Sequence, residues 1–400
     1  MWKRLGFVLL ALAGCQTPEA QFQLVETAPV ESSIGSDDLP EFHEKWRELI
    51  GAASDSIDLA HFYASNELGS RLEAVIVALE SAAARGVRVR FLADEKFYGT
   101  YPGTLDRLAA VAGIEVRRLD LSAATGGVLH AKYLVVDGRI TCLGSANFDW
   151  RSLEHIQELG AIVDNAAVAG ALLDVFDLDW RLAQAGSTNP RIEPGMGADA
   201  FPVELTMADG ASLMVTPVFS PRSLLPADEL WDLPRLIAWI DEAREHLRIQ
   251  LLTFRMEDRK GERFEELESA IRSAAERGVQ VRLLVADWGK RRGTIEGLKE
   301  LGTVKGIEVR MVTVPPSQAG HIPFGRVIHS KYMVVDQDRA WVGTSNWERS
   351  YFHKSRNVGL LIEGEACARR LIRYFDDGWS GPYSYPVEPD VEYAVPRIGE

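Results

Sequence analysis

Two stretches of this 400-residue chain read His130-Ala-Lys-Tyr-Leu-Val-Val-Asp137 and His329-Ser-Lys-Tyr-Met-Val-Val-Asp336. Each places a histidine and a lysine two positions apart, ahead of a valine pair and an aspartate. The apolar run favours a buried strand that ends at the aspartate, and residues i and i+2 of a strand lie on the same face. Each stretch therefore predicts an imidazole and an ammonium group side by side on one face of a sheet.

The polar residues that follow also keep one spacing in both copies. After six intervening residues come Gly144-Ser145-Ala-Asn147 in the first copy and Gly343-Thr344-Ser-Asn346 in the second. A return strand and a tight turn at the glycine would bring these side chains next to the histidine and lysine. We expect the two copies to meet at one site that grips a phosphate oxyanion, with the imidazoles as nucleophile and general acid.

Both copies belong to a longer internal repeat. Residues 83–94 and 275–287 share an Arg-Gly-Val pattern that leads into alternating apolar and charged residues. The periodicity predicts a helix before this pattern, a strand within it and a closing helix over 166–180 or 366–379. The chain therefore repeats one order of elements.

Strands that alternate with helices indicate a layered α/β fold. We predict two similar α/β domains, at residues 41–185 and 211–395, joined by a linker over 186–210 that contains Gly, Pro and Ser. The domains would pack as an internally duplicated, pseudo-twofold pair with one active site at their interface.

The N-terminus has the pattern of an export signal. Lys3 and Arg4 precede an apolar run that is too short to span a bilayer and that ends in Leu12-Ala-Gly-Cys15. This ending resembles the bacterial lipobox, which implies a signal peptide over 1–15, a lipid on Cys15 and a polar tether over 16–40. It further implies an exported protein anchored to a bacterial membrane, on the outer membrane facing the periplasm. The alternative is an ordinary signal peptide whose cysteine is incidental.

The charge balance restricts the class of partner. Lys and Arg total 44 and Asp and Glu total 58, which gives a formal net charge of −14 at pH 7. That balance argues against a broad basic surface for nucleic acid, although it permits a small basic cleft. The sequence shows no separate cluster with metal-ligand spacing, so we expect no metal and no other cofactor. We infer no obligatory protein partner.

The doubled pattern His-x-Lys-x4-Asp-x6-Gly-(Ser/Thr)-x-Asn resembles the HKD motif of the phospholipase D superfamily, over nearly the whole chain after the signal. Residues 143–153 and 158–160, with the insertion at 322–327, are similar to the branch of endolysosomal phospholipase D-like 5′ exonucleases. The resemblance implies a metal-independent phosphodiesterase in which one histidine becomes a phosphohistidine and the other protonates the leaving oxygen. It implies these site residues: His130, His329, Lys132, Lys331, Asp137 and Asp336 as catalytic, with Asn147, Asn346, Ser145 and Thr344 as phosphate-binding.

The family also uses a downstream acid to orient a histidine, and Glu158 matches that position. The corresponding residue of the second half is Asn357, which is not an acid. A carboxylate on Nδ1 raises the basicity of an imidazole and fixes its tautomer, so the two histidines would be chemically unequal. We expect Glu158 to support the nucleophile. The sequence does not decide whether Glu158 contacts His130 of its own half or His329 across the interface.

The substrate stays open between two classes. The narrower resemblance favours single-stranded DNA or RNA, and the stretches 288–292 and 347–356 combine aromatic and basic residues that would suit such a strand. The alternative is phospholipid chemistry, either head-group hydrolysis or phosphatidyl transfer of the kind that cardiolipin synthases perform. A catalytically dead binding lipoprotein is disfavoured, because both motifs are complete.

Overall fold

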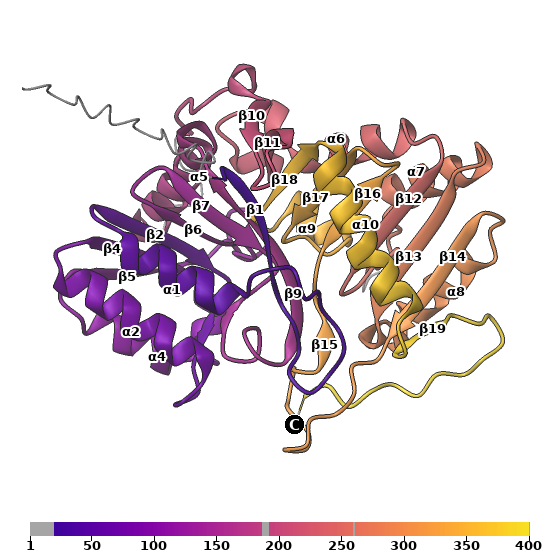
Figure 1. The fold of residues 1–400 in the computed structure, drawn as a ribbon, viewed down its shortest axis with the longest axis horizontal. Coiled ribbons are helices and arrows are strands. Elements are labelled where there is room, and N and C mark those ends of the chain that lie inside the picture. Colours follow the sequence, from indigo (N-terminus) through magenta and orange to yellow (C-terminus); the bar gives the residue numbers. More distant parts are fainter. Residues whose placement is uncertain (1–19, 186–191, 259–260, 400) are drawn as a thin grey trace, which may run out of the picture.

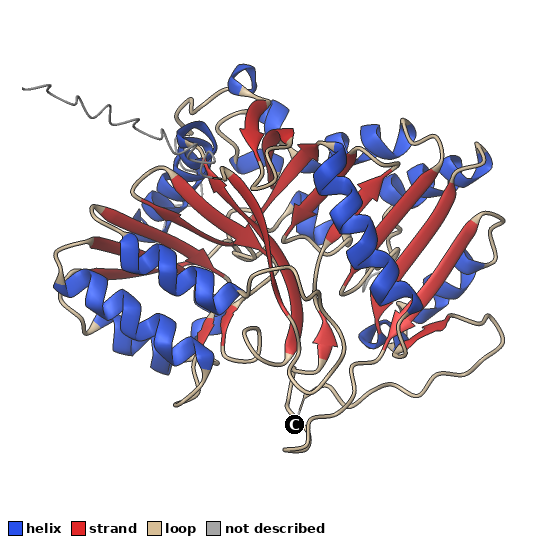
Figure 2. Cartoon of the chain, viewed as in Figure 1, coloured by secondary structure: helices blue, strands red, loops and turns tan. Residues whose placement is uncertain are grey.

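A computed structural model describes residues 20–185, 192–258 and 261–399. Two α/β halves lie side by side, the first in indigo to magenta and the second in pink to yellow (Figure 1). Each half has one large sheet with helices against it (Figure 2). The predicted signal, including Cys15, lies outside the described residues.

The sheet of the first half runs in the order β1-β9-β7-β6-β2-β4-β5. Its strands are β1 (Phe22–Thr27), β2 (Ser56–His61), β4 (Arg88–Asp94), β5 (Ile114–Leu119), β6 (Lys132–Val136), β7 (Ile140–Gly144) and β9 (Ile156–Asp164). Its helices are α1 (Phe42–Ala52), α2 (Arg71–Ala84), α3 (Glu95–Tyr98), α4 (Pro102–Ala109) and α5 (Ala166–Ala185). The short strands β3 (Ala64–Ser65) and β8 (Phe148–Asp149) pair separately.

The sheet of the second half runs in the order β10-β11-β18-β17-β16-β12-β13-β14-β19. Its strands are β10 (Val203–Thr206), β11 (Ser212–Ser220), β12 (His246–Leu251), β13 (Gln280–Ala286), β14 (Ile307–Val312), β16 (Tyr332–Val335), β17 (Arg339–Gly343), β18 (Asn357–Glu363) and β19 (Ser384–Pro386). Its helices are α6 (Asp232–Asp241), α7 (Glu265–Glu276), α8 (Ile295–Gly302), α9 (Arg349–His353) and α10 (Glu365–Ser380). The shared order confirms the predicted α/β fold and its duplication.

Helix α2 shows why the repeated pattern folds as it does. Leu72, Ile76 and Leu79 form a buried stripe at helical spacing. Ser70 caps the N-terminus by accepting a hydrogen bond from the backbone N–H of the third helical residue, and Gly86 lies past the end with a φ of 95°. The chain then continues into β4, as the alternating pattern predicts.

The two halves share an apolar core. One cluster of buried side chains includes Tyr133 and Phe176 of the first half together with Tyr332 and Phe375 of the second. The helices α5 and α10 both contribute to it, while each half also has a cluster of its own on the outer side of its sheet. The shared core fixes the halves against each other, so the edges that carry the motifs have a defined relative position.

Two predicted boundaries are wrong. Residues 22–27 lie within the predicted polar tether, yet they form β1, which pairs antiparallel with β9, and Phe22, Leu24 and Val25 are buried. Polar residues lie on both sides of this short strand, so its few apolar residues do not stand out as a strand in the sequence. Likewise β10 lies inside the predicted linker over 186–210, because Val203 to Thr206 pair with β11.

The glycines of the motif act differently from the prediction. Gly144 does not make a tight turn but ends β7 directly opposite Gly160 of β9. A Cβ atom on Gly144 would collide with the backbone of Gly160, so this residue permits a close approach of two strands. The approach places Ser145 beside the residues that precede Gly160.

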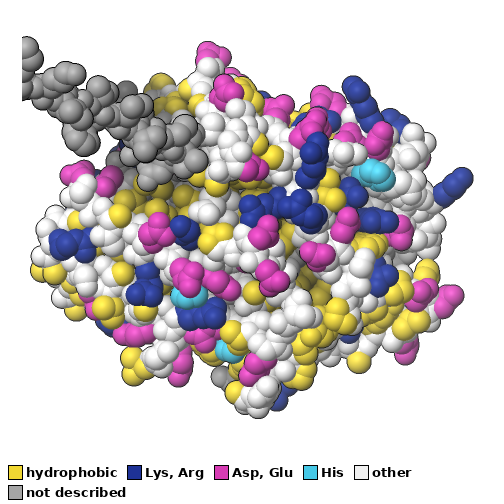
Figure 3. Space-filling view, in the orientation of Figure 1, with side chains coloured by type: hydrophobic (Ala, Val, Ile, Leu, Met, Phe, Trp, Pro, Cys, Tyr) yellow, Lys and Arg dark blue, Asp and Glu magenta, His cyan; other side chains and the backbone are white. Residues whose placement is uncertain are grey.

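The surface agrees with the charge balance. Lys and Arg side chains are interspersed with Asp and Glu side chains on the face shown in Figure 3, with no broad basic area there. Within the described ranges, no helix is both long enough and apolar enough to cross a membrane.

Candidate active site

Both motif histidines are held in place by the opposite half. The backbone N–H of His130 donates to the carbonyl of Arg356 at 2.9 Å, and that of His329 donates to the carbonyl of Gln157 at 2.8 Å. Just before His329, the short strand β15 (Val327–Ile328) pairs in parallel with β9 of the first half. These crossed backbone contacts bring the two motifs to one site at the interface.

Glu158 contacts the histidine of the other half. Its carboxylate accepts from Nδ1 of His329, with the two oxygens at 2.9 and 3.0 Å. It also accepts from the Ser145 hydroxyl, and it is fully buried. Although burial alone would raise the pKa of Glu158, the neighbouring His329 and Lys331 lower it, so the carboxylate is charged. The question that the sequence left open is answered by the contact with His329.

Asn357 makes the equivalent contact with His130. Its Oδ1 accepts from Nδ1 of His130 at 3.0 Å and from the Thr344 hydroxyl at 2.9 Å. Its Nδ2 donates to the backbone carbonyls of Tyr351 and Ser355, at 2.9 and 3.3 Å, which assigns the orientation of the amide. His130 therefore carries a proton on Nδ1, and its Nε2 is the nitrogen available for proton transfer.

The two motif lysines are buried next to the histidines. Nζ of Lys132 donates to the carbonyl of His130 at 2.6 Å, and Nζ of Lys331 donates to the carbonyl of His329. Burial lowers the pKa of Lys331 to about 7, and burial together with Lys331 holds the pKa of Lys132 well below its usual range. Among the described residues, Glu158 is the carboxylate that acts on both buried amines, so an anion bound beside them would favour their protonated, positively charged forms.

Both imidazoles lose their protons readily in this environment. Burial lowers the pKa of His329 to about 4, even though Glu158 acts in the opposite direction. Burial, and then Lys132 and Lys331, hold the pKa of His130 well below 6.5. A bound phosphodiester would counter the lysine charges and raise the pKa of the imidazoles, which allows one of them to carry a proton when substrate is present.

A family model described as the cardiolipin synthase, PLD-like domain matches residues 46–180 and 236–379, once in each half. The chain belongs to the phospholipase D-like family.

Several relatives match the phospholipase D-like chain over most of its length. It is 33% identical to the 5'-3' exonuclease PLD3 of Bos taurus, over 97% of this chain and 84% of that protein. It is 30% identical to the 5'-3' exonuclease PLD4 of Homo sapiens, over 95% and 81%, and 30% identical to Phospholipase D Z of Dictyostelium discoideum, over 91% and 90%. Phosphatidylserine synthase of Haemophilus influenzae Rd KW20 shares the fold, with a TM-score of 0.64 at 12% identity over 92% of this chain and 87% of that chain.

Two predicted phosphate-binding groups have another role in this phospholipase D-like site. The hydroxyl of Ser145 donates to Glu158 and that of Thr344 donates to Asn357, and both hydroxyls also accept a backbone N–H. They position the partners of the histidines and are not free to bind phosphate. The asparagines differ, because Oδ1 of Asn147 and of Asn346 is buried without a hydrogen-bond partner among the described residues. These two side-chain oxygens are therefore not held by the fold.

The motif aspartates are not at the site, so their assignment as catalytic residues is wrong. Asp137 and Asp336 lie at the far ends of β6 and β16, where they adopt φ values of 50° and 52°. The carboxylate of Asp137 accepts the backbone N–H groups of residues 54–56, and that of Asp336 accepts those of residues 244–246. Each aspartate fastens the loop that enters the central strand of its half.

Replacing Asp137 tests this structural role. Asp137→Asn should reduce the free energy of unfolding by about 1–3 kcal/mol, because a charged acceptor of three backbone N–H groups is lost. These hydrogen bonds outweigh burial and lower the pKa of Asp137, so its stabilisation is present at neutral pH and is lost as the pH falls below 3.8. Denaturant unfolding at pH 7 and at acidic pH measures the effect. A loss of kcat of a hundredfold or more in the folded variant would restore the aspartate to the catalytic set.

Several residues proposed as cleft residues lie in the core. Trp347 and Phe352 are fully buried. Arg356 is buried too, where its guanidinium forms an ion pair with Asp179 of α5 at 2.7 and 2.8 Å. Sequence reasoning missed this pair, which joins the two halves next to the carbonyl that holds His130. Only the position of Asp179 in the closing helix hinted at it.

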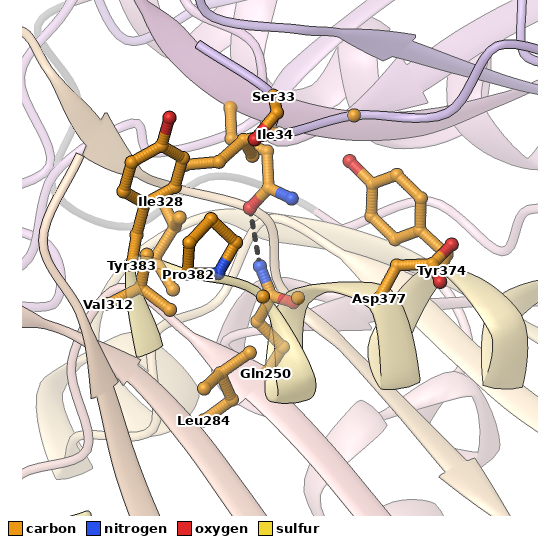
Figure 4. Close-up of a pocket in the computed structure, with 14 residues that line it drawn as sticks. Ser33, Ile34, Gln250, Leu284, Val312, Ile328, Tyr374, Asp377, Pro382 and Tyr383 are labelled. Atoms are coloured by element: carbon orange, nitrogen blue, oxygen red, sulfur yellow. Dashed lines mark hydrogen bonds between the residues drawn. The ribbon is translucent and has the colours of Figure 1, made fainter. Parts of the chain in front are cut away.

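A pocket lies behind the site, on the other face of the strand that carries Glu158. Gln157 and Ile328 line it, since neighbours along a strand point to opposite faces. Figure 4 shows the Gln250 side chain pointing into this pocket, where Nε2 donates to Oε1 of Gln157 at 2.6 Å. The pocket is formed by both halves and is separated from the histidines by backbone. No group of three or more potential metal ligands occurs in the described part of the chain.

Proposed function

We propose that this phosphodiesterase hydrolyses single-stranded DNA or RNA from the 5′ end, with His329 as the nucleophile. The observation that carries the proposal is the pair of buried lysines, Lys132 and Lys331, facing one carboxylate between two imidazoles. A phosphodiester supplies the missing negative charge. The similarity to relatives named 5'-3' exonucleases supports the choice of substrate.

The two histidines take different roles because their partners differ. Glu158 accepts the Nδ1 proton of His329, which makes Nε2 of that ring the more basic nitrogen. Nε2 of His329 attacks phosphorus and forms a nitrogen–phosphorus bond while the bond to the leaving oxygen breaks. His130 gives its Nε2 proton to that oxygen. Water then gives a proton to His130 and attacks phosphorus, which releases a phosphate monoester and free His329.

A direct assay tests the substrate. The protein without residues 1–15 is incubated with 5′-hydroxyl and 5′-phosphate single-stranded oligonucleotides, with duplex DNA and with phosphatidylglycerol or phosphatidylcholine vesicles. Stepwise release of nucleotides from the single strands, without lipid turnover, is expected. Head-group release without nucleotide release would replace this proposal with phospholipase chemistry. Parallel reactions with EDTA test the expected metal independence.

We also propose that Cys15 carries a lipid that anchors the exported protein to a bacterial membrane, on the outer membrane facing the periplasm. The support is the sequence Leu12-Ala-Gly-Cys15 after a short apolar run. Full-length protein and Cys15→Ser are compared in a Gram-negative host by metabolic labelling with a fatty acid and by membrane fractionation. Equal labelling of both would contradict the anchor.

A further inference from the structure

A row of aromatic rings leads away from His130 on the first half. Phe62 lies 4.9 Å from His130 between ring centroids, and Phe97 lies 4.0 Å from Phe62. Tyr63 then stacks on Phe97 at 5.9 Å and on Tyr101 at 5.1 Å, with interplanar angles of 24° and 27°. Phe62, Tyr63, Phe97 and Tyr101 are all partly exposed, and we call them the aromatic wall.

The aromatic wall follows from where its residues lie in the fold. Phe62 and Tyr63 come directly after β2, while Phe97 belongs to α3 after the neighbouring parallel strand β4. The carboxyl ends of parallel strands meet at one edge of a sheet, so the rings collect next to the motif. The outermost ring, Tyr101, borders a surface hollow of about 410 Å³ whose rim includes Leu68, which is 83% exposed. The wall therefore continues from the catalytic histidine to the surface.

The second half presents arginines where the first half presents rings. Leu252 and Thr253 follow β12 in the places that Phe62 and Tyr63 take after β2. Thr253 donates to Glu348, whose N–H donates to the carbonyl of Asn346. Arg291 lies close to both Glu348 and Arg255, and the charge of each residue acts on the pKa of Arg291.

Arg255 and Arg291 form what we call the arginine wall. Burial, and then the neighbouring Arg255, lower the pKa of Arg291. Among the described residues, neither guanidinium is part of a salt bridge within 4 Å, although a carboxylate lies nearby. The backbone N–H of Arg255 donates to the carbonyl of Trp347 at 3.0 Å, the residue after Asn346, so Arg255 lies next to the motif of the second half.

We propose that the aromatic wall stacks nucleobases on one side of the scissile phosphate while the arginine wall binds backbone phosphates on the other side. Single-stranded nucleic acid combines the two groups that these walls recognise, flat apolar bases and repeated negative charges. The proposal rests on the proposed function and adds which half of the protein binds the bases and which binds the phosphates. Variants of the aromatic wall should change the preference for bases, and variants of the arginine wall should change the salt dependence.

The first experiment removes the bases. Wild-type protein is assayed with an oligonucleotide and with the same backbone carrying abasic residues around the first cleaved bond. The base-bearing strand should have a KM about tenfold lower, which corresponds to one stacked base. Tyr101→Leu, which keeps apolar volume but loses the aromatic face, should reduce that difference to less than threefold, and Tyr101→Phe should restore it.

The control is Tyr98→Leu in α3, the short helix that also carries Phe97, since the Tyr98 ring lies under Arg118 at 4.1 Å and not in the wall. It should keep the wild-type preference for bases. Equal KM values of wild-type protein for both strands would overturn the stacking role while leaving the exonuclease proposal intact. Failure to cleave either strand would overturn the exonuclease proposal itself.

The second experiment varies the salt concentration. Arg291→Gln should make the slope of log(kcat/KM) against log[salt] shallower by about 0.7, the value for one phosphate contact with a single strand. The preference for bases over abasic residues should stay unchanged. Arg88→Gln is the charge control. Arg88 is the first residue of β4, at the end of that strand away from the aromatic wall, so this variant should keep the wild-type slope. An unchanged slope in Arg291→Gln, or the same change in both variants, would contradict the arginine wall.

Discussion

His329→Ala should show no phosphoenzyme, whereas His130→Ala should accumulate it. Removing either histidine should reduce kcat on an oligonucleotide by about 10³-fold or more, since both steps need the nucleophile and a proton donor. The difference appears with a p-nitrophenyl ester of thymidine phosphate, whose leaving group departs without protonation. In His130→Ala, Nε2 of His329 still attacks this ester and expels p-nitrophenolate, but no second imidazole activates water, so the thymidylyl group stays on His329 as the trapped phosphohistidine.

Mass spectrometry of the intact protein and mapping of the phosphorylated peptide check this outcome. The species on His329 should be stable in alkali and lost in acid, as expected for a nitrogen–phosphorus bond. Thermal unfolding of both variants controls for folding, because the backbone N–H of each histidine, which contacts the opposite half, is retained in alanine. Phosphoenzyme in His329→Ala and none in His130→Ala would exchange the two roles.

Glu158 and Asn357, which accept hydrogen bonds from the imidazoles, should set the pH dependence of kcat/KM. Glu158→Gln removes the carboxylate that raises the pKa of His329, and should lower kcat by about 10²–10⁴-fold, because the tautomer and basicity of the nucleophile are no longer fixed. In the wild type, the lowered pKa of His130 means that this ring loses its proton as the pH rises through the acidic range. kcat/KM should therefore be higher at pH 5 than at pH 7.5.

Asn357→Asp tests the same reasoning in the opposite direction. A carboxylate next to Nδ1 of His130 would raise the pKa of that ring, so the decline of kcat/KM should move to higher pH. The Thr344 hydroxyl already donates to Oδ1 at this position and can serve the new carboxylate. A pH profile identical to that of the wild type would mean that His130 does not carry the proton that controls the alkaline side.

The sequence predicted the fold and the central groups because they depend on local pattern and exact repetition. The spacing of His130 and Lys132 placed them next to each other, and the second copy indicated a site between two halves. The α/β order of elements followed from the same repetition. The strands β1 and β10 lie outside the predicted domain bounds, because polar segments flank each of them.

The remaining features depend on contacts between distant residues, which spacing does not encode. The contact of Glu158 with His329 and not with His130 follows from the crossing of the halves. Asp137 shares the motif yet lies at the other end of its strand, because Lys132 begins the five-residue strand β6 and Asp137 follows its last residue. Ser145 is itself one of the predicted phosphate-binding residues, but its hydroxyl donates to the buried carboxylate of Glu158. Arg356 lies in a segment of aromatic and basic residues, so the sequence predicts an exposed side chain. In the structure it is buried, because it pairs with Asp179 of the other half.

The crossed pairing of each histidine with a residue of the other half has an evolutionary consequence. In an assembly of two identical subunits, any substitution occurs at both positions, so both histidines would keep the same partner. Joining both halves in one chain removes that constraint, and position 158 has a carboxylate while position 357 has an amide. The fused chain can therefore give its reaction a direction, in which one half always attacks and the other always handles the proton.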